Sequence, residues 1–190
     1  MTLYNYVNGR EGLEDLVVEA VIGSTVLPAL QHDWRDDVIA TATALWQVLR
    51  SHPKAIPLIL TRRSVSASSY APAERIIAAL SRAGLDDFQV LAGFRGVLAL
   101  VTGLAQAEFA DTFAGTSHHD QVNIDGAAQV GQLAGSQYPH IAALARVSQR
   151  SSATEDFRCA LGMFLAGIAA GYQPKRRSMS GKSRWQESLS

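Results

Sequence analysis

Apolar residues recur every three or four positions along most of the chain, and this spacing predicts amphipathic helices rather than strands. In the first such stretch, Leu13 and Val17 share one face. Asn8 precedes it and is followed by Glu11 three positions later, as in a capping box that satisfies two amide donors at a helix start. A hairpin turn at Asn8-Gly9 is the alternative, but the residues after it do not alternate. We therefore expect a short aromatic segment, a turn and then a helix.

A second helix is predicted for DWRDDVIATATALWQVLRSH, with Asp33 and Asp36 as caps and Pro53 as the stop. Its apolar stripe consists of Val38, Ala42, Leu45 and Leu49. The short segment PLILTRR and the polar linker SVSASSY follow. Pro72 then suits the first turn of a helix, and Gly84 stands where the end of that helix needs a left-handed residue.

The longest predicted helix is DDFQVLAGFRGVLALVTGLAQAEFAD, which opens on a capping box of Asp86 and Gln89. One row of apolar residues steps by four and three positions, as at a helix–helix interface: Val90, Phe94, Val97, Val101 and Leu104. A second apolar row lies beside it: Phe88, Leu91, Leu98 and Ala105. A helix that is apolar on two sides needs two apolar partners to cover it. Its own domain supplies one, and a ligand cavity or a second subunit supplies the other.

The region after this helix changes character. Residues 112–137 are rich in Gly, Ala, Gln and His without an apolar stripe, so we expect a flexible loop. The stretch YPHIAALARVSQ predicts a short helix with Pro139 in its first turn. The last helix, SATEDFRCALGMFLAGIAAG, starts on a capping box of Ser152 and Glu155. Its apolar face consists of Phe157, Leu161, Phe164 and Ile168. The polar and basic residues 173–190 predict a disordered tail.

The charge balance and the cysteine content exclude some classes of protein. The 190 residues include 17 Lys plus Arg and 17 Asp plus Glu, so the chain lacks the basic excess of a broad polyanion-binding surface. The single cysteine, Cys159, cannot form an intrachain disulfide, which suits a cytoplasmic location. The longest near-uncharged segment, 88–105, is interrupted by Arg95 and is too short to span a bilayer. We therefore expect a buried helix and no membrane partner.

Candidate catalytic groups are few. TSHHD, from Thr116 to Asp120, offers two imidazoles and a carboxylate. Adjacent side chains on a loop point apart, whereas metal ligands must converge, so we expect no metal. Cys159 lies among apolar residues, as an inert buried thiol does. The chain has no nucleophile elbow and no glycine-rich phosphate-binding motif. The prediction is a protein that is not an enzyme and needs no cofactor. A small helical metal-dependent enzyme that uses the Ser-His-His-Asp loop is the alternative.

A hydrophobic ligand pocket is a second interpretation of the apolar helices. Trp46 and Phe94 are candidate walls, because ligand cavities are lined mainly by apolar and aromatic groups, although ordinary core positions look the same. Thr41, Thr43 and Arg95 are polar residues placed among these walls. Arg95 is alone in an apolar helix, so it reaches solvent, pairs with an acid across an interface or faces a polar ligand.

Several stretches taken together resemble the tetracycline-repressor (TetR) family of transcription regulators. TLYNYVNGREGLEDLVVEAV is similar to the end of the family's helix-turn-helix and its connecting helix. The other matching stretches resemble the family's C-terminal regulatory domain: ALWQVLRSHP, LILTRR, ALSRAG, VTGLAQAE, YPHIAAL and EDFRCALGMFLAGI. They keep the family's order over roughly residues 1–171. The resemblance implies an all-α fold and a ligand-responsive repressor.

By this resemblance, residues 1–8 are the remnant of a DNA-recognition helix, inside which the chain begins. The positions that match DNA contacts in the family are Thr2, Tyr4, Asn5, Tyr6 and Arg10. A helix-turn-helix holds its recognition helix in the major groove through partner helices. We therefore expect binding to operator DNA only when the preceding helices are present.

The resemblance makes residues 9–172 the ligand-binding and dimerisation domain. With the patterns above, it places the effector among Thr41, Leu45, Trp46, Ile76, Leu91, Phe94, Arg95 and Leu98. It implies a homodimer through a four-helix bundle of the longest and last helices, with Val90, Val97, Val101, Leu104, Phe157, Leu161, Phe164 and Ile168 at the interface. Leu58 stands where tetracycline repressors have a metal-ligating His, so the expected effector is a small, mostly hydrophobic molecule that binds without metal. A dimerisation module without ligand is the third alternative.

Overall fold

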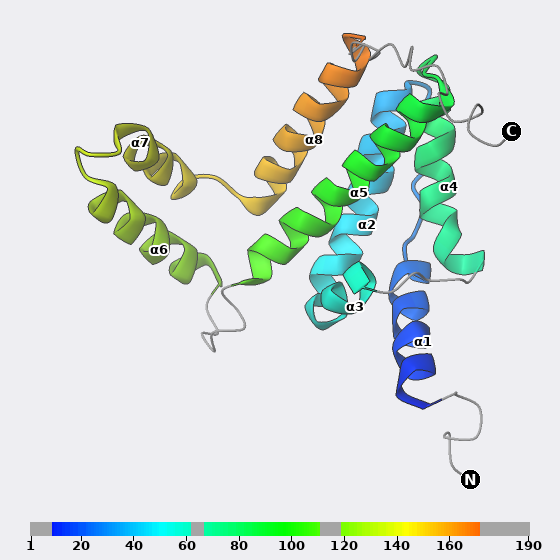
Figure 1. Ribbon diagram of the computed structural model, residues 1–190, viewed down its shortest axis with the longest axis horizontal. Coiled ribbons are helices and arrows are strands. Elements are labelled where there is room, and N and C mark those ends of the chain that lie inside the picture. The colour runs from blue at the N-terminus through cyan, green and yellow to red at the C-terminus, as the bar shows by residue number, and fades with distance from the viewer. Residues whose placement is uncertain (1–8, 62–66, 111–118, 172–190) are drawn as a thin grey trace, which may run out of the picture.

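Helices dominate the structure, a computed structural model that describes residues 9–61, 67–110 and 119–171 (Figure 1). In chain order the elements are α1 (Gly9–Gly23), α2 (Trp34–Ser51), the 3-10 turn η2 (Pro53–Ala55), α3 (Ile56–Thr61), α4 (Ala67–Ser81), α5 (Asp87–Ala110), α6 (His119–Ala134), α7 (Pro139–Ser148) and α8 (Ala153–Ala169). These ranges contain no strand, which confirms the all-α prediction. The expected recognition-helix remnant 1–8 and tail 173–190 lie outside the described residues.

Local capping signals set the starts of three helices as predicted. Asp33 caps α2 by accepting a backbone N–H of its first turn at 2.7 Å. Before α5, Asp86 Oδ1 accepts from the backbone N–H of Gln89 at 2.8 Å, and Gln89 Oε1 accepts from that of Asp86 at 3.0 Å. Ser152 and Glu155 form the same reciprocal box at α8. Each cap satisfies amides that have no partner within their own helix.

The core lies around α2, which packs against α4, α5 and α8 (Figure 1). The predicted stripe of α2 is buried: Val38, Ala42, Leu45 and Leu49. The helices around it supply the other fully buried residues, among them Ile76, Ala79 and Leu80 of α4, Val97, Val101 and Ala105 of α5, and Phe157, Leu161 and Leu165 of α8. Burying one large apolar side chain contributes roughly 1.5–3 kcal/mol. A core of this size stabilises α1–α5 and α8 as one body.

The polar linker before α4 is shorter than predicted. Residues 67–71 extend α4, so Pro72 lies inside this helix instead of in its first turn. A proline within a helix removes one backbone hydrogen bond. The Pro72 ring is buried in the body. Gly84 follows the helix with φ +73°, the left-handed conformation expected there.

The loop predicted for residues 112–137 contains the helix α6, so the prediction is wrong for residues 119–134. Alanine and glutamine favour a helix without making an apolar stripe, so the local pattern does not mark it. Packing against α7 supplies the missing stabilisation. Ala134 and Ala145 are each 6% exposed, and a Cβ added to Gly131 would lie 3.6 Å from the Cβ of Ala145.

Helices α6 and α7 form a hairpin, here termed the arm, that stands away from the body (Figure 1). The two helices pack mainly against each other. Large apolar side chains remain exposed on the arm: Val130, Leu133, Tyr138, Ile141, Leu144 and Val147. Leu133 is 79% exposed and Leu144 is 68% exposed. The arm therefore has apolar surface that the described part of the chain does not cover.

The longest helix, α5, is more apolar than expected. The segment Asp87–Glu108 of α5 is long and apolar enough to cross a membrane. This contradicts the prediction that the apolar segment of this helix is too short to do so. A helix in the core of a domain meets the same criterion, and α5 packs against α2, α4 and α8. Only 22% of that segment is buried, however. The expectation of a buried helix therefore holds for one side of α5 and fails for the other.

Candidate functional site

An aromatic and charged cluster occupies the end of the body where α2 and α5 finish and α8 starts. The rings of Trp46 and Phe157 stack with centroids 4.6 Å apart and planes 4° from parallel. The guanidinium carbon of Arg50 lies 4.6 Å from the Trp46 ring centroid, and Arg50 Nε donates to Glu108 Oε1 at 2.9 Å. Trp46 is 1% exposed, whereas the Arg50 side chain is 36% exposed. The cluster therefore runs from the interior to the surface.

Several buried polar atoms of α2 and α5 have no hydrogen-bond partner among the described residues. They are Thr41 Oγ1, Thr43 Oγ1, Trp46 Nε1, Gln106 Oε1 and Glu108 Oε2. Other helical hydroxyls are satisfied locally, as where Thr102 Oγ1 donates to the carbonyl of Leu98 at 2.8 Å. A buried polar atom without a partner costs about 1–3 kcal/mol. These atoms are therefore candidates for contact with a bound molecule.

The predicted pocket residues fall into two groups. Inside the body lie Thr41, Leu45, Trp46 and Ile76, which are between 0% and 6% exposed. Phe94 and Leu98 are partly buried against the same core. Leu91 is 43% exposed, and Arg95 is exposed as well. Because these two residues are four positions apart, they share the outward side of α5. The structure therefore does not bring Leu91 and Arg95 to the interior group.

The predicted interface residues face the interior of the chain. Val97, Val101, Phe157 and Leu161 are each 0% exposed. A side chain without exposed surface in one chain has none to bury against a second chain, so these four form the packing of α5 and α8 within the subunit. This corrects the prediction that they form the seam between subunits. The other four are partly buried against the same core: Val90, Leu104, Phe164 and Ile168.

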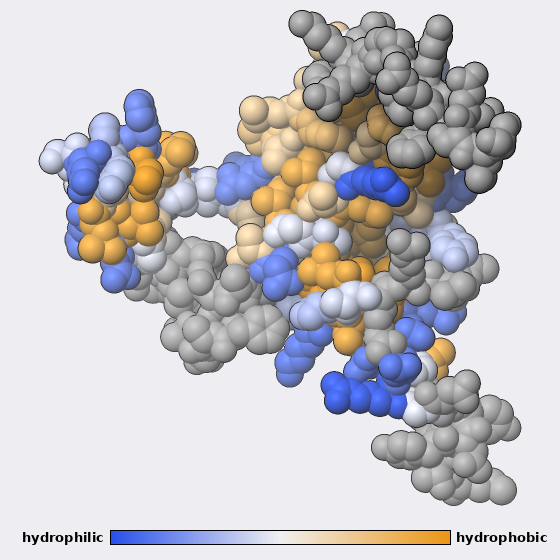
Figure 2. Space-filling view, viewed as in Figure 1, coloured by the Kyte–Doolittle hydropathy of each residue, from blue (hydrophilic) through white to orange (hydrophobic). Residues whose placement is uncertain are grey.

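A different set of small and apolar residues lines the outward sides of α5 and α8. This outer face consists of Phe88, Leu91, Ala92, Ala99, Gly103 and Ala107 of α5 and Cys159, Met163, Ala166 and Gly167 of α8. Figure 2 shows apolar surface over these two helices. Cys159 is exposed, which corrects the prediction of a buried thiol. The predicted second apolar row contained two residues of this face, Phe88 and Leu91, whereas its member Ala105 is 0% exposed. Sequence reasoning missed the small residues of the face, although Ala99, Gly103 and Ala107 at four-residue spacing were a signal for them.

A buried carboxylate that was not predicted joins α2 to α4. Asp37 is 1% exposed and accepts from Arg75 Nη2 at 2.9 Å and from Arg82. The two guanidinium groups also donate to the carbonyls of Pro28, at 3.4 Å, and Gln31, at 3.1 Å. Burial acts to raise the pKa of Asp37, but hydrogen bonds from Arg75 and the Gln31 N–H, with the charges of both arginines, hold it below the ordinary value. The ionised Asp37 thus fixes the α1–α2 connection against α4.

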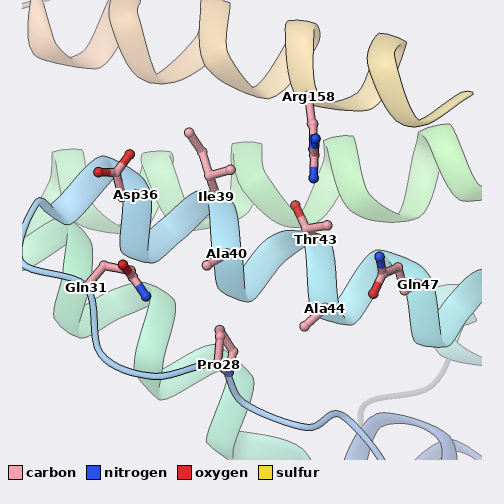
Figure 3. Close-up of a pocket in the computed structure, with 9 residues that line it drawn as sticks. All are labelled: Pro28, Gln31, Asp36, Ile39, Ala40, Thr43, Ala44, Gln47 and Arg158. Carbon is pink, nitrogen blue, oxygen red and sulfur yellow. The ribbon is translucent and has the colours of Figure 1, made fainter. Parts of the chain in front are cut away.

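Several open grooves lie on the described part of the body, and two of them contain residues that the sequence pointed to, Thr43 in one and Leu58 in the other. One, of about 490 Å³, follows the outward side of α2 and is lined by Pro28, Gln31, Asp36, Ile39, Ala40, Thr43, Ala44, Gln47 and Arg158 (Figure 3). In the close-up, Arg158 reaches from α8 toward Thr43. The other, of about 500 Å³, includes Val17 and Leu58. Neither groove is lined by the predicted pocket residues, of which Thr41, Leu45, Trp46 and Ile76 lie in packed core.

The remaining predictions are only partly within the described residues. No group of three or more His, Cys, Asp or Glu side chains suited to a metal occurs in the described ranges. Ser117 and His118 lie outside these ranges, as do four of the predicted DNA contacts: Thr2, Tyr4, Asn5 and Tyr6. Arg10, the fifth, lies in the first turn of α1, where its side chain is 90% exposed and its Nε contacts Glu14 at 2.7 Å.

Comparison with known sequences places most of the chain in one family. A family model described as the tetracyclin repressor-like C-terminal domain matches residues 27–172, which extend from the connection before α2 to the end of α8. A curated HTH-type transcriptional regulator of Saccharopolyspora erythraea is 37% identical over 108 residues. That match covers 56% of this chain and 46% of the relative, so it spans less than half of the relative's length.

Solved structures from Streptomyces coelicolor share the fold. The TetR family protein ActR, in complex with actinorhodin, matches with a TM-score of 0.73 at 21% identity, over 90% of this chain and 81% of that one. A second TetR transcriptional regulator matches with a TM-score of 0.72 at 20% identity, over 90% and 82% of the two chains. At these identities the likeness concerns the fold. The family-model match covers well over half of the sequence, and the chain belongs to the family of tetracycline repressor-like C-terminal domains.

Proposed function

We propose that this chain is the effector-binding and dimerising part of a ligand-responsive transcription regulator that binds operator DNA. The family and the relative described as an HTH-type transcriptional regulator support this proposal. So does ActR, which has the same fold and was solved with actinorhodin. The observation that carries the proposal is the set of buried, unpaired polar atoms in an apolar helical body, because a bound small molecule satisfies them.

Regulation in such a protein is a shift between two arrangements. An effector that binds one arrangement more tightly favours it, and operator affinity changes by no more than that difference in binding. In this chain α1 packs against α4, and Asp37 with Arg75 and Arg82 ties the α1–α2 connection to α4. A change of the core is thereby passed to α1, the helix that follows the expected DNA-recognition segment.

The proposed effector is mostly hydrophobic and binds without metal. The interior group of Thr41, Leu45, Trp46 and Ile76 offers an apolar wall with two polar atoms. By the resemblance, Leu58 stands where tetracycline repressors have a metal-ligating His, and the side chain of Leu58 has no atom that can bind a metal. A ligand of this kind gains affinity mainly from apolar surface, and its few polar atoms fix its orientation.

A thermal-shift screen of hydrophobic compounds, run with magnesium and again with EDTA, tests this proposal. A compound that binds the native chain stabilises it by about 2.7 kcal/mol at a hundredfold excess over its dissociation constant. We expect hits that keep their shift in EDTA. A screen in which no compound raises the unfolding temperature would count against effector binding, and hits that vanish in EDTA would count against metal-free binding.

The homodimer is proposed to form through the outer face of α5 and α8 and not through the buried residues of these helices. Phe88 is 72% exposed and Met163 is 72% exposed, which leaves large apolar side chains in water in a single chain. Small residues such as Ala99 and Gly103 let two helices approach closely. Stable homodimers bury on the order of 2,000 Å² or more in apolar interfaces. Pairing α5 and α8 with their copies forms a four-helix bundle about a two-fold axis.

Two matched substitutions test the position of this interface. Ala99→Arg places a charge in the middle of the outer face, whereas Ala78→Arg does so at an exposed position of α4. Sedimentation at micromolar concentration is expected to show a dimer for the wild type and for Ala78→Arg and a monomer for Ala99→Arg, because a charge stranded in an apolar interface is costly. A monomeric wild type, or a dimer that tolerates Ala99→Arg, contradicts the proposal.

A further inference from the structure

The groove along the outward side of α2 is bounded by three separate parts of the chain (Figure 3). Pro28 and Gln31 come from the connection before α2, Arg158 comes from α8, and α2 supplies the rest of the lining. Its volume of about 490 Å³ is within the roughly 300–1,000 Å³ of small-molecule sites. Unlike the packed core around Trp46, this groove is open to a ligand from solvent.

A cation and a hydroxyl group meet in this groove without bonding to each other. Arg158 is exposed, and among the described residues no carboxylate pairs with it. Thr43 Oγ1 is a buried atom that has no hydrogen-bond partner there either. In the close-up, the Arg158 guanidinium points toward the Thr43 side chain (Figure 3). Both groups can donate a hydrogen bond, so an acceptor placed between them satisfies both. Because Arg158 is exposed, its side chain can shift to admit that acceptor.

The charges of the groove limit the acceptor to a group with a single negative charge. A carboxylate accepts two parallel hydrogen bonds from a guanidinium and keeps lone pairs for a hydroxyl. Among the described residues that line the groove, Arg158 supplies the one positive charge and Asp36 a negative one. A phosphate dianion would therefore keep a charge without a counter-ion. A carboxylate is the group that Arg158 and Thr43 fit together.

The rest of the ligand has to be apolar and neutral. On the side of Thr43 nearer the start of α2, Ile39 and Ala40 form the floor, and Pro28 faces Ala40. Asp36 closes that end, seven positions before Thr43 and so about 10 Å away along the helix axis. An aliphatic body of this length covers the apolar floor. A second anionic group at its far end would meet the Asp36 carboxylate.

We infer that this groove is a second ligand site, which binds a small monocarboxylate with a neutral aliphatic body. The carboxylate bridges Arg158 and Thr43, and the aliphatic body lies on Ile39 and Ala40. The site is separate from the interior group proposed for the hydrophobic effector, so the inference goes beyond the proposed function. A ligand in this groove contacts α8 and the connection before α2 at once, and it thereby links the last helix to the segment that leads from α1.

Three probes of equal chain length separate the parts of the inference: octanoate, octanamide and octanedioate. Each is titrated in a ligand-observed NMR experiment at pH 7 and constant ionic strength. We expect octanoate to bind saturably and about tenfold more tightly than octanamide, because hydrogen bonds between charged groups are the stronger ones. Octanoate that does not bind saturably, or that binds no more tightly than octanamide, would overturn the inference.

Octanedioate tests the neutral body. It is expected to bind several-fold more weakly than octanoate, because its second carboxylate lies next to Asp36. Asp36→Asn should remove most of that difference and leave the affinity for octanoate nearly unchanged. Equal affinity of the wild type for octanoate and octanedioate would overturn the placement of the body beside Asp36.

Matched variants locate the site. Arg158→Gln keeps a long polar side chain but removes the charge, and it is expected to lower the affinity for octanoate to that for octanamide. Arg150→Gln, at an exposed position before α8 and outside the groove, should leave the affinity unchanged. Thr43→Val keeps the shape of the side chain without its hydroxyl and should weaken octanoate binding about fivefold or more. Unchanged binding in Arg158→Gln, or an equal loss in Arg150→Gln, would overturn the inference.

Failure of this inference is distinguishable from failure of the proposed function. Hydrophobic compounds from the thermal-shift screen that stabilise the wild type and Arg158→Gln equally bind outside the groove, so effector binding stands even if octanoate does not bind. If octanoate binds as predicted but no hydrophobic compound stabilises the chain, the carboxylate site stands and the proposed hydrophobic effector falls.

Discussion

The body and the arm are both helical but differ in what covers their apolar surface. In the body, α2 buries its stripe against three neighbouring helices, and charged groups such as Asp37 have their partners within the chain. In the arm, α6 and α7 cover each other with small residues and leave six large apolar side chains exposed. The core of the body is therefore covered within a single chain. The arm and the outer face of α5 and α8 have surfaces suited to a second subunit.

Truncating one leucine in the body and one in the arm should give the largest difference in the free energy of unfolding. Leu161→Ala, at a position that is 0% exposed, is expected to lower the free energy of unfolding by about 3–4 kcal/mol, as buried leucine truncations do. Leu133→Ala, at a position that is 79% exposed, is expected to change it by less than about 0.5 kcal/mol. Urea unfolding of the monomeric Ala99→Arg chain measures both. Similar losses in the two variants would mean that the arm is not the less supported region.

Removing the buried carboxylate should have the next largest effect. Asp37→Ala leaves Arg75 and Arg82 without their counter-ion. We expect it to lower the free energy of unfolding by about 2–3 kcal/mol. This lies below the usual cost of breaking a buried pair, because the two arginine side chains are 20% and 38% exposed. Asp36→Ala, at the neighbouring exposed position, is the control and should change stability little. Urea unfolding near pH 7 compares them.

The same carboxylate should make the body sensitive to acid. The pKa of Asp37 is lowered on folding, so its contribution to stability is fully present above the unfolded-state pKa of about 3.9 and is lost as the pH falls through the lower folded-state pKa. Asp37→Asn is expected to be less stable than the wild type at neutral pH, and the gap should narrow in acid. A gap that stays constant down to the lowest pH at which the chain is folded would argue against this role.

Local rules predicted the parts of the fold that depend on neighbouring residues in the sequence. The caps at Asp33, Asp86 and Ser152 and the stripe of α2 needed no more than spacing and side-chain chemistry. Helix α6 was missed because its support comes from α7. The candidate site was predicted in part: Trp46 was named, but Phe157 was assigned to the wrong partner. Arg50 and Glu108, 58 positions apart, were not found because no local pattern joins them.

The orientation of α5 is another feature that local sequence patterns could not predict. Its row of residues at four and three spacing was predicted correctly as a packing seam, but spacing alone does not say which neighbour the row meets. Val97 and Val101 turn toward the core of their own chain. The opposite side, with Ala99 and Gly103, is the exposed one. A face of small residues has a weak periodic signal, because alanine and glycine are common in helices of every kind.

The smallest effect is expected at the start of α1. Arg10 contacts Glu14 four positions later on the helix surface, with its side chain 90% exposed. Arg10→Ala is expected to reduce stability by about 0.3–0.5 kcal/mol, because solvent and salt screen such pairs. Thermal unfolding at low and at high salt should show this difference shrink as salt rises. A loss above 1 kcal/mol would indicate that Arg10 has a structural role beyond the helix surface.

Hydrogen exchange of the dimeric wild type and the monomeric Ala99→Arg chain tests most directly whether a second subunit completes the arm. Exchange of each amide reports the free energy of its local opening. The account predicts that residues 126–147 exchange markedly more slowly in the dimer, whereas residues 38–49 of α2 are equally protected in both chains. Equal exchange of the arm in dimer and monomer, or loss of protection in α2 of the monomer, would contradict it.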